Sequence, residues 1–421
     1  MTLASVARAE QKWLLPTYER QKVLFTHGRG VYLWDSTGRR YLDFLSGIGV
    51  NALGHTHPAI QRVLKRQAGK LIHTSNLFYH EYQAELAKRL TRISGLDRAF
   101  FSNSGTEAWE GALKLARVYA RANQHNRHKA KWRLLALENS FHGRTFGSLA
   151  TTGQEKYRRP FAPLVPGVNF VAFNDLDDLK RKFDGTVCAV CLETIQGEGG
   201  IQLVSREFLQ LARQLTENAG ALLVLDEIQS GLGRTGKHFA YQHYGIRPDM
   251  VTVAKPLAAG LPLGALLATE RVAGGIHPGM HGTTFGGGPL ACAVAVECLR
   301  QIEGLLPNVK KLGAYFRAQL EQLQSKHPSI QEVRGLGLML AVELESADLA
   351  KRVVAQLLAE GILINRTHDT VLRFLPPYTI EKKHVDEVIR RLALALEKTP
   401  TADSRGHGVR QRKTTEEGAT P

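Results

Sequence analysis

The sequence has few cysteines and no long apolar run, and both absences narrow the class of protein. Its 421 residues include only four cysteines, which do not make a disulfide framework and fit a reducing compartment. No stretch approaches the roughly 18 apolar residues that a membrane-spanning helix requires. The first 16 residues carry Arg8, Glu10 and Lys12 where a signal peptide needs an apolar stretch. We therefore expect a cytoplasmic protein with no membrane segment.

Acidic residues are scarce relative to basic ones: 39 Asp and Glu stand against 55 Lys and Arg, a formal net charge of +16. Such an excess raises the question of a nucleic-acid partner. The densest basic cluster, residues 117–133, contains six Lys or Arg and no acid. It has no interleaved aromatic stacking platform and no nucleic-acid-binding motif. We interpret it as a solvated helix end and loop, with attraction of dicarboxylate substrates as the alternative, and expect no nucleic-acid partner.

Candidate metal ligands are also sparse. Cys188 and Cys191 form a C-x-x-C, a spacing used by redox and metal sites. They lie in an apolar run, however, and positions three apart on a strand face opposite sides, so we interpret both as buried small side chains. His55 and His57 are interpreted as turn residues beside Pro58. No metal site is expected.

The apolar pattern predicts four parts. Residues 1–60 form an N-terminal segment of short strands that packs with a small domain, 61–298 a large domain, 299–398 the small α/β domain, and 399–421 a disordered tail. Apolar runs alternate with helix-length segments in the large domain, which favours a mostly parallel sheet covered on both faces. The strands expected there are Arg98–Ser102, Leu134–Glu138, Val187–Ile195, Ala221–Ile228, Met250–Ala254 and Gly264–Thr269.

Two of these apolar runs end in residues of opposite charge. Asp226 ends the run 221–225, and Lys255 follows the run 251–254; ligands of open α/β sheets bind at such strand ends. A buried carboxylate is costly unless it is paired, and the protonated ring nitrogen of a pyridoxal cofactor would supply a partner, although a helix-capping aspartate is an alternative. A lysine that loses hydration becomes a nucleophilic amine, although a lysine that reaches solvent is the simpler interpretation.

A third candidate is the segment Ser-Asn-Ser-Gly-Thr-Glu-Ala at 102–108, between a predicted strand and an amphipathic helix. Small hydroxyl residues and glycine at a helix N-terminus let backbone N–H groups surround a phosphate. A simple helix cap with Glu107 behind it is the alternative, and on local sequence it is the stronger one.

Further motifs occur with these three in a fixed order: Phe-His-Gly-Arg at 141–144, Glu-Thr-Ile-Gln-Gly-Glu-Gly-Gly at 193–200, Asp-Glu-Ile-Gln-Ser-Gly-Leu-Gly-Arg-Thr-Gly at 226–236, Ala-Lys-Pro at 254–256 and His-Gly-Thr-Thr-Phe-Gly-Gly at 281–287. The series resembles the class III (ω-amino) aminotransferases of fold type I, from roughly Tyr18 to Arg391. The resemblance implies a pyridoxal-phosphate-dependent transaminase that is a homodimer with shared active sites. Within the class, the chain is most similar to the acetylornithine aminotransferases of arginine biosynthesis.

The resemblance implies roles for the residues around the cofactor. Lys255 would hold pyridoxal 5'-phosphate as an imine and, once freed, move a proton between the substrate carbon and the cofactor. Asp226 would pair with the pyridinium nitrogen, Phe141 would stack on the ring, and Gln229 would lie near the phenolic oxygen. The residues that would hold the phosphate are Ser104, Gly105 and Thr106, with Thr284 reaching it from the partner subunit.

Four residues are implied in substrate binding. Arg144, assisted by Tyr18, would bind the carboxylate at the far end of the donor. Arg373 matches the arginine that takes the α-carboxylate of glutamate, and Glu198 matches the acid that pairs with that arginine when glutamate is absent.

The sequence departs from the family pattern at three places. Trp109 stands where asparagine is usual. Gly288 stands at the asparagine of the usual Gly-Gly-Asn-Pro. Residues 256–260 contain fewer glycines than the usual family sequence after the lysine. None of the departures removes a catalytic group. They lead us to expect changes in the pocket wall, and therefore in acyl specificity.

The segment 46–51, Ser-Gly-Ile-Gly-Val-Asn, lacks the tyrosine that ornithine δ-aminotransferases usually carry there. This favours N2-acetyl-L-ornithine as the donor of its δ-amino group to 2-oxoglutarate, giving N-acetylglutamate 5-semialdehyde and L-glutamate. Ornithine, succinylornithine, carrier-linked aminoadipate derivatives and 4-aminobutyrate stay open, because one methylene or acyl change shifts binding by only about 1–3 kcal/mol. A glutamate-1-semialdehyde mutase is disfavoured by Arg373, and a non-enzymatic regulator by the intact Lys255.

Overall fold

The computed structural model describes residues 2–123 and 130–397. The predicted tail at 399–421 and the middle of the basic cluster at 117–133 lie outside these residues. Among the described helices, none is both long and apolar enough to cross a membrane.

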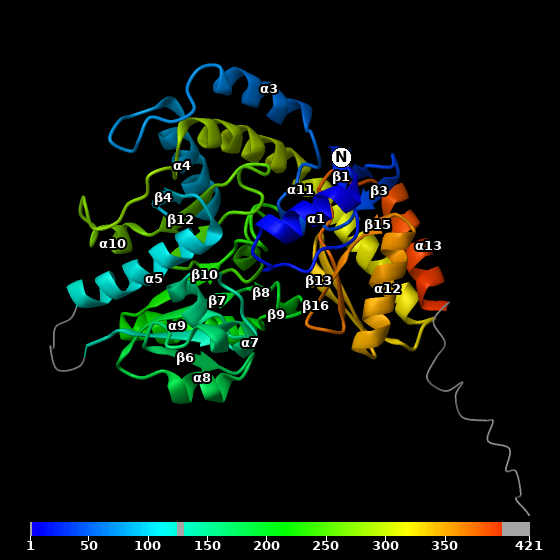
Figure 1. Cartoon of the computed structure of the whole chain (residues 1–421). Helices are drawn as coiled ribbons and strands as arrows, with labels where there is room; N and C mark the ends of the chain where they lie inside the picture. The colour runs from blue at the N-terminus through cyan, green and yellow to red at the C-terminus, as the bar shows by residue number, and fades with distance from the viewer. Residues whose placement is uncertain (1, 124–129, 398–421) are drawn as a thin grey trace, which may run out of the picture.

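The centre of the large domain is a seven-stranded sheet in the order β4-β12-β11-β10-β7-β5-β6 (Figure 1). Neighbouring strands are parallel except that β12 runs antiparallel to both β11 and β4. The predicted mostly parallel α/β sheet is therefore confirmed. The strand β6 was not predicted, because it is short and only partly buried. The strands are β4 (Arg98–Ser102), β5 (Arg133–Leu137), β6 (Val168–Val171), β7 (Val187–Glu193), β10 (Leu222–Asp226), β11 (Met250–Val253) and β12 (Gly264–Ala268).

Helices cover both faces of this sheet, and successive side chains of β10 pack alternately against the helices of the two faces. Leu222 and Val224 pack in one core with α5 (Gly105–Ala122), whereas Leu223 and Leu225 pack in the other with α9 (Arg206–Ala219). Burial of both faces explains why the strands are continuous apolar runs rather than alternating ones. The other helices of this part are α4 (Glu81–Ser94), α6 (Phe146–Thr151), α7 (Glu155–Arg158), α8 (Leu176–Lys182) and α10 (Glu270–Ala273), with the 3₁₀ turns η1 (Arg159–Phe161) and η2 (Ala240–His243) and the short pair β8 (Ile195–Gln196) and β9 (Gln202–Leu203).

The N-terminal strands share a sheet with the C-terminal part of the chain. This sheet has the order β1-β2-β3-β15, and β15 pairs in parallel with β3. A second four-stranded sheet, β13-β14-β17-β16, lies beside it. The strands are β1 (Phe25–Arg29), β2 (Tyr32–Asp35), β3 (Arg40–Asp43), β13 (Ile330–Leu336), β14 (Met339–Leu344), β15 (Ile362–Leu363), β16 (Asn365–Thr367) and β17 (Val371–Phe374).

A single long helix, α11 (Pro289–Gln324), joins the two halves of the chain. The predicted boundary between residues 298 and 299 falls inside it, and the division into domains stays a prediction. The remaining helices are α1 (Leu3–Trp13), α2 (Ser46–Gly49), α3 (Pro58–Ala68), α12 (Ala347–Ala359) and α13 (Lys382–Glu397).

The two cysteines on β7 do not face opposite sides of the strand, as their spacing predicted. Cys188 and Cys191 are free and buried, but both pack in the core on the α5 face rather than on opposite faces. The reason is a break in register between β5 and β7, where Arg133 pairs with Val187 and Leu134 with Ala189. The extra residue of such a bulge shifts the alternation of side chains between the two faces of the sheet by one position. Burial raises the pKa of the Cys188 thiol to about 11, so neither redox nor metal chemistry is favoured there.

Candidate active site

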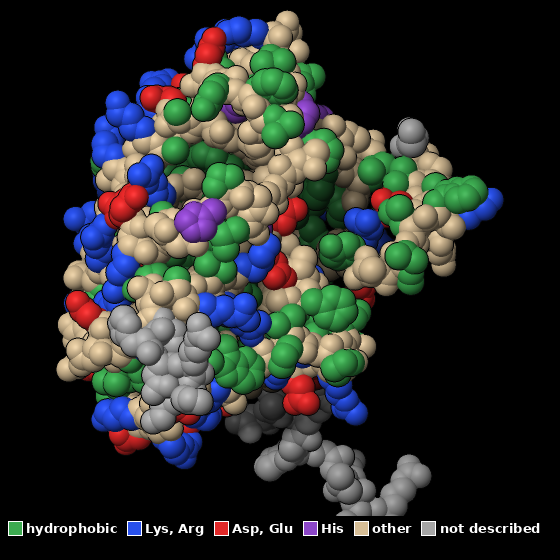
Figure 2. Space-filling view, turned by 90° about the vertical axis from the view of Figure 1, so that its left-hand side faces the viewer, with side chains coloured by type: hydrophobic (Ala, Val, Ile, Leu, Met, Phe, Trp, Pro, Cys, Tyr) green, Lys and Arg blue, Asp and Glu red, His purple; other side chains and the backbone are tan. Residues whose placement is uncertain are grey.

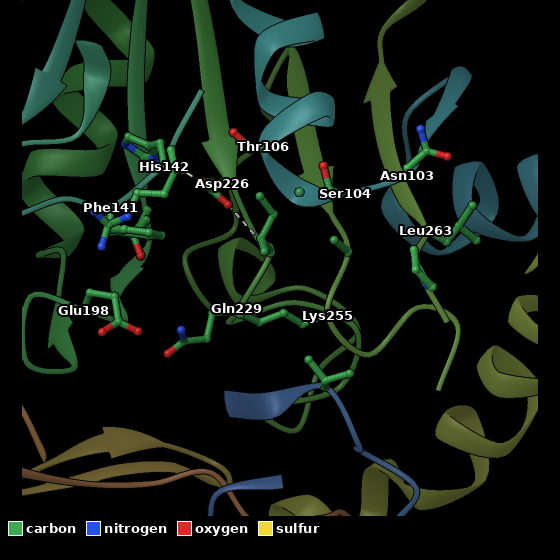
Figure 3. Close-up of a pocket in the computed structure, with 18 of the residues that line it drawn as sticks. Asn103, Ser104, Thr106, Phe141, His142, Glu198, Asp226, Gln229, Lys255 and Leu263 are labelled. Carbon is green, nitrogen blue, oxygen red and sulfur yellow. Dashed lines mark hydrogen bonds and ion pairs between the residues drawn. The ribbon is translucent and has the colours of Figure 1, made fainter. Parts of the chain in front are cut away.

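A cavity of about 430 Å³ lies at the carboxyl ends of the parallel strands (Figure 3). Loops that follow β4, β5, β7, β10 and β11 meet there, as the topology of an open parallel sheet requires. Nine of the predicted site residues line it: Ser104, Gly105, Thr106, Phe141, Arg144, Glu198, Asp226, Gln229 and Lys255. Within the described residues, no group of three or more His, Cys, Asp or Glu side chains is placed to hold a metal ion.

Asp226 is the last residue of β10 and is buried. Its Oδ2 accepts a hydrogen bond from Nδ1 of His142 at 2.8 Å, and its Oδ1 accepts one from the backbone N–H of Ile228 at 3.0 Å. The Thr252 hydroxyl donates a longer bond to Oδ1 at 3.5 Å. A carboxylate can accept about four hydrogen bonds, so acceptor capacity remains toward the cavity. The site therefore offers a fixed anion to a protonated group of a ligand.

Lys255 follows β11, the parallel neighbour of β10. Its side chain is partly open to the cavity but surrounded by protein, and this burial lowers the pKa of Lys255 from its ordinary value of 10.5, with Arg373 acting in the same direction. The charges of Glu198 and Asp226 oppose that shift. A lysine with a lowered pKa supplies free amine more readily, which is the form that attacks a carbonyl carbon.

The N-terminus of α5 forms another wall of the cavity. Ser104 is its N-cap, and Gly105 and Thr106 are its first two residues. The first N–H groups of a helix have no partner within it and favour an anion. The Oγ1 of Thr106 lies 2.6 Å from the Ser148 hydroxyl. Gly143, with φ of 136°, passes so close that a Cβ there would lie 2.3 Å from that Oγ1.

Phe141 and Arg144 come from the loop after β5. Phe141 meets Tyr157 edge to face, with ring centroids 6.0 Å apart. The guanidinium carbon of Arg144 lies 4.0 Å from the Tyr157 ring centroid and 5.5 Å from that of Phe141. The cation is thus held over aromatic rings at the cavity wall, where a carboxylate of a ligand can reach it.

Glu198, on the cavity wall, forms an ion pair with Arg373 behind it, with Oε1 and Nη1 2.5 Å apart. Arg373 lies on β17 of the C-terminal sheet and is 1% exposed. Its Nη1 also donates to the carbonyl of Gly197 at 3.1 Å and its Nε to Oδ1 of Asn365 at 3.1 Å. Burial opposes ionisation of Glu198, but the charges of Arg373 and Lys255 outweigh it and the pKa of Glu198 is lowered.

Three predicted site residues do not line this cavity: Arg373 meets it only through Glu198 and Gln229, and Tyr18 and Thr284 lie away from it. Tyr18 is 78% exposed, and its ring contacts Arg20 instead. Thr284 lies in a separate shallow hollow with His73, His80 and neighbouring glycines. The single chain does not bring either residue to the cavity.

The departures from the family pattern are placed differently from what we expected. Trp109 is fully buried behind the cavity wall, stacked on His142, and Gly288 lies in the hollow beside Thr284. Neither lines the cavity, so the expectation that these two alter the pocket wall is wrong. Gly260, in the third departure, does line it.

Glu193 was missed by the sequence analysis, although it ends β7 as Asp226 ends β10. The two carboxylates are paired in register on adjacent strands. Glu193 accepts hydrogen bonds from the backbone N–H groups of Phe141 and Gly197, both at 2.9 Å. Burial and the neighbouring charge of Asp226 raise the pKa of Glu193. The residue joins the loop that carries Phe141 to the loop that carries Glu198.

The segment 46–51 reaches the cavity through Val50. Gly47 and Ile48 have left-handed backbones, with φ of 63° and 61°. A β-branched residue in that region is strained, and Ile48 is turned outward and 38% exposed. The wall here is therefore formed by a small aliphatic side chain rather than by an aromatic one.

Comparison with known proteins agrees with this geometry. The aminotransferase class-III sequence model matches residues 16–396. The chain is 46% identical over 385 residues to an acetylornithine aminotransferase from Caldanaerobacter subterraneus subsp. tengcongensis, covering 91% of this chain and 97% of that one. Among solved structures, the ornithine aminotransferase of Toxoplasma gondii superposes with a TM-score of 0.90 at 33% identity, covering 94% and 95% of the two chains. The acetylornithine aminotransferase of Elizabethkingia anophelis gives 0.83 at 31% identity, covering 95% and 100%. The chain therefore belongs to the class-III aminotransferases, a family that implies pyridoxal phosphate as cofactor.

Proposed function

We propose that the chain transfers the δ-amino group of N2-acetyl-L-ornithine to 2-oxoglutarate, giving N-acetylglutamate 5-semialdehyde and L-glutamate. The names of several relatives, including the one from Caldanaerobacter, support this donor. The Glu198–Arg373 ion pair, whose acid lines the cavity, is the observation that best supports a reaction with two unlike donors.

The residues of the cavity fit pyridoxal 5'-phosphate. The N-terminus of α5, with Ser104, Gly105 and Thr106, suits a phosphate. Asp226 suits a protonated ring nitrogen, Phe141 offers a flat apolar surface, and Gln229 offers an amide to the phenolic oxygen. When bound, the cofactor supplies an electron sink that allows the carbon bearing the amino group to lose a proton.

Lys255 is the residue we assign to covalent attachment and proton transfer. Its Nζ would hold the cofactor before the donor arrives and would be freed when the donor amine takes its place. The free amine would then accept the proton from the substrate carbon and return it one position away. The lowered pKa of Lys255 serves both steps, because it keeps more of the side chain in the neutral form.

The charged residues at the cavity wall then decide how each donor lies. Arg144 binds the distant carboxylate of acetylornithine while Glu198 occupies Arg373, so the methylene chain meets no bare cation. Glutamate brings its own α-carboxylate, which displaces Glu198 from Arg373. Tyr18 assists Arg144 only if the N-terminal segment closes over the cavity or a partner subunit brings it there.

Free ornithine is the second candidate donor, since the Toxoplasma ornithine aminotransferase has a closely similar fold. Val50 and the outward Ile48 disfavour it, because they offer no hydroxyl to a free α-amine. Assay of a donor panel against 2-oxoglutarate tests the proposal: N-acetylornithine should have the highest kcat/KM among acetylornithine, ornithine, succinylornithine and 4-aminobutyrate. A tenfold advantage for any other donor, about 1.4 kcal/mol in transition-state binding, would overturn it.

We further propose a cytoplasmic homodimer in which each subunit contributes to the other's site. Large hydrophobic side chains are exposed on the N-terminal segment and on the loop after α3, and Figure 2 shows hydrophobic groups gathered on this face. Patches of this kind mark interaction surfaces. The exposed residues include Trp13, Leu15, Ile72, Leu77, Phe78, Tyr79 and, beside Thr284, Phe285.

A further inference from the structure

Behind the cavity wall, two aromatic rings from different elements lie face to face. The indole of Trp109 on α5 and the imidazole of His142 have centroids 4.1 Å apart and planes inclined by only 10°. Trp109 is fully buried and His142 nearly so. Neither residue is needed as a ligand in the proposed function, since the imidazole presents its Nδ1 to Asp226 rather than to the open cavity.

Both residues are anchored to the same short stretch at the end of α6. Trp109 donates its Nε1–H to the Thr151 hydroxyl at 2.9 Å. The backbone N–H of His142 donates to the Thr152 hydroxyl at 3.0 Å. The indole is also fully buried, so it is a fixed surface for the imidazole.

The imidazole has one hydrogen bond to its ring, from Nδ1 to Asp226 at 2.8 Å. Its Nε2 is buried and has no hydrogen-bond partner among the described residues. Rotation of the ring about its Cβ–Cγ bond would move Nδ1 away from Asp226, and the stack on Trp109 opposes this rotation. The chain of contacts from Trp109 through His142 ends at the Asp226 carboxylate, and Figure 3 shows His142 beside Asp226 at the cavity.

We propose that Trp109 and His142 are positioning residues for Asp226: the indole fixes the plane of the imidazole, and the imidazole N–H holds the carboxylate in the orientation that receives the protonated ring nitrogen of the cofactor. This inference rests on the proposed function. Outer residues that orient a ligand-binding group commonly change affinity by about ten- to hundredfold when they are removed. The sequence analysis could not assign this role, because it depends on a contact between residues 33 positions apart that belong to different elements.

The test is a titration of cofactor-free protein with pyridoxal 5'-phosphate, with the dissociation constant and the absorbance maximum of the bound cofactor as readouts. Trp109→Leu should weaken binding by roughly tenfold, and His142→Leu by roughly ten- to hundredfold. Trp109→Phe, which keeps a stacking ring, and His142→Asn, whose amide N–H can replace Nδ1–H, should both restore most of the affinity. Leu113→Ala, on the same buried face of α5, is the matched control for lost packing and should leave both readouts unchanged.

A double-mutant cycle decides whether Trp109 acts through His142. In the His142→Leu background, Trp109→Leu should have no further effect on affinity. An undiminished tenfold loss in that background would overturn the proposal. Equal losses of affinity for Trp109→Leu and Leu113→Ala in the otherwise wild-type protein would overturn it as well. Trp109→Met, with a flexible side chain of larger volume, replaces Trp109→Leu if the latter does not fold. If wild type binds the cofactor and Asp226→Asn weakens binding while Trp109→Leu does not, only this inference fails. If wild type binds no cofactor, the proposed function fails with it.

Discussion

The Nη1 of Arg373 lies 2.5 Å from Oε1 of Glu198, so a cation from the C-terminal sheet is neutralised by an acid from the loop after β7. Removal of one partner from a buried ion pair costs roughly 3–5 kcal/mol, because the remaining charge is left uncompensated. We therefore expect the pair to stay closed until an incoming carboxylate replaces Glu198. Acetylornithine has no carboxylate near its reacting amine, whereas glutamate does.

Opposite effects on the two half-reactions follow from this pair. Glu198→Ala should slow the acetylornithine half-reaction and spare or improve the glutamate one. Arg373→Ala should slow the glutamate half-reaction by roughly ten- to hundredfold, since a hydrogen bond to a charged group contributes about 1.5–3 kcal/mol, and should affect acetylornithine less. Single-turnover absorbance changes of the bound cofactor measure each half separately. Equal losses in both halves for both variants would show that neither residue acts as a switch.

Lys255 should make the stability of the cofactor-free protein depend on pH. Its pKa is lowered in the folded state, so between that lowered pKa and the ordinary value near 10.5 the unfolded chain binds more protons. Stability then rises with pH across this window; it falls as pH is lowered from 10.5 and levels off below the folded pKa, where the folded protein is protonated as well. Lys255→Met should be more stable than wild type at neutral pH, and the difference in midpoint should shrink toward pH 10.5.

Thermal or urea unfolding of the cofactor-free proteins at several pH values measures this difference. The exposed Lys156 provides a control, because Lys156→Met should show no such pH-dependent gap. A Lys255→Met variant that is less stable than wild type at neutral pH would contradict the burial argument.

Thr284 tests the shared site. It lies outside the cavity of its own chain, so we expect a direct contact with the cofactor to come from the Thr284 side chain across a subunit interface. Thr284→Val should weaken binding of pyridoxal phosphate, whereas Thr283→Val, one position away, should change it less. Sedimentation under assay conditions should find a dimer, and a fully active monomer would rule out the shared site.

The sequence was most informative where burial imposes a simple pattern. Strands with both faces covered are continuous apolar runs, so β4, β7, β10 and β11 could be predicted, and with them the strand-end positions of Asp226 and Lys255. The same reasoning would have found Glu193, which ends β7 as Asp226 ends β10. It could not find a register break within β7, which brings Cys188 and Cys191 to one face. The placement of Arg373 beside Glu198 came from the family resemblance, since these residues are 175 positions apart.

Trp109 marks another limit of the sequence. We expected Trp109 to change the pocket wall. On α5, however, its side chain points away from the cavity and packs on His142. The direction of a side chain on α5 depends on how the helix packs on the sheet, and local sequence does not specify that.

The claim on which all of these arguments depend is that the cavity holds pyridoxal phosphate on Lys255. Borohydride reduction of the cofactor-loaded protein, followed by proteolysis and peptide mapping, tests it directly. We predict a single pyridoxyl group on the Nζ of Lys255, and a Lys255→Ala variant that still binds the cofactor through its phosphate and Asp226 but has almost no turnover. A pyridoxyl group on any other lysine, or full turnover by Lys255→Ala, would contradict the account.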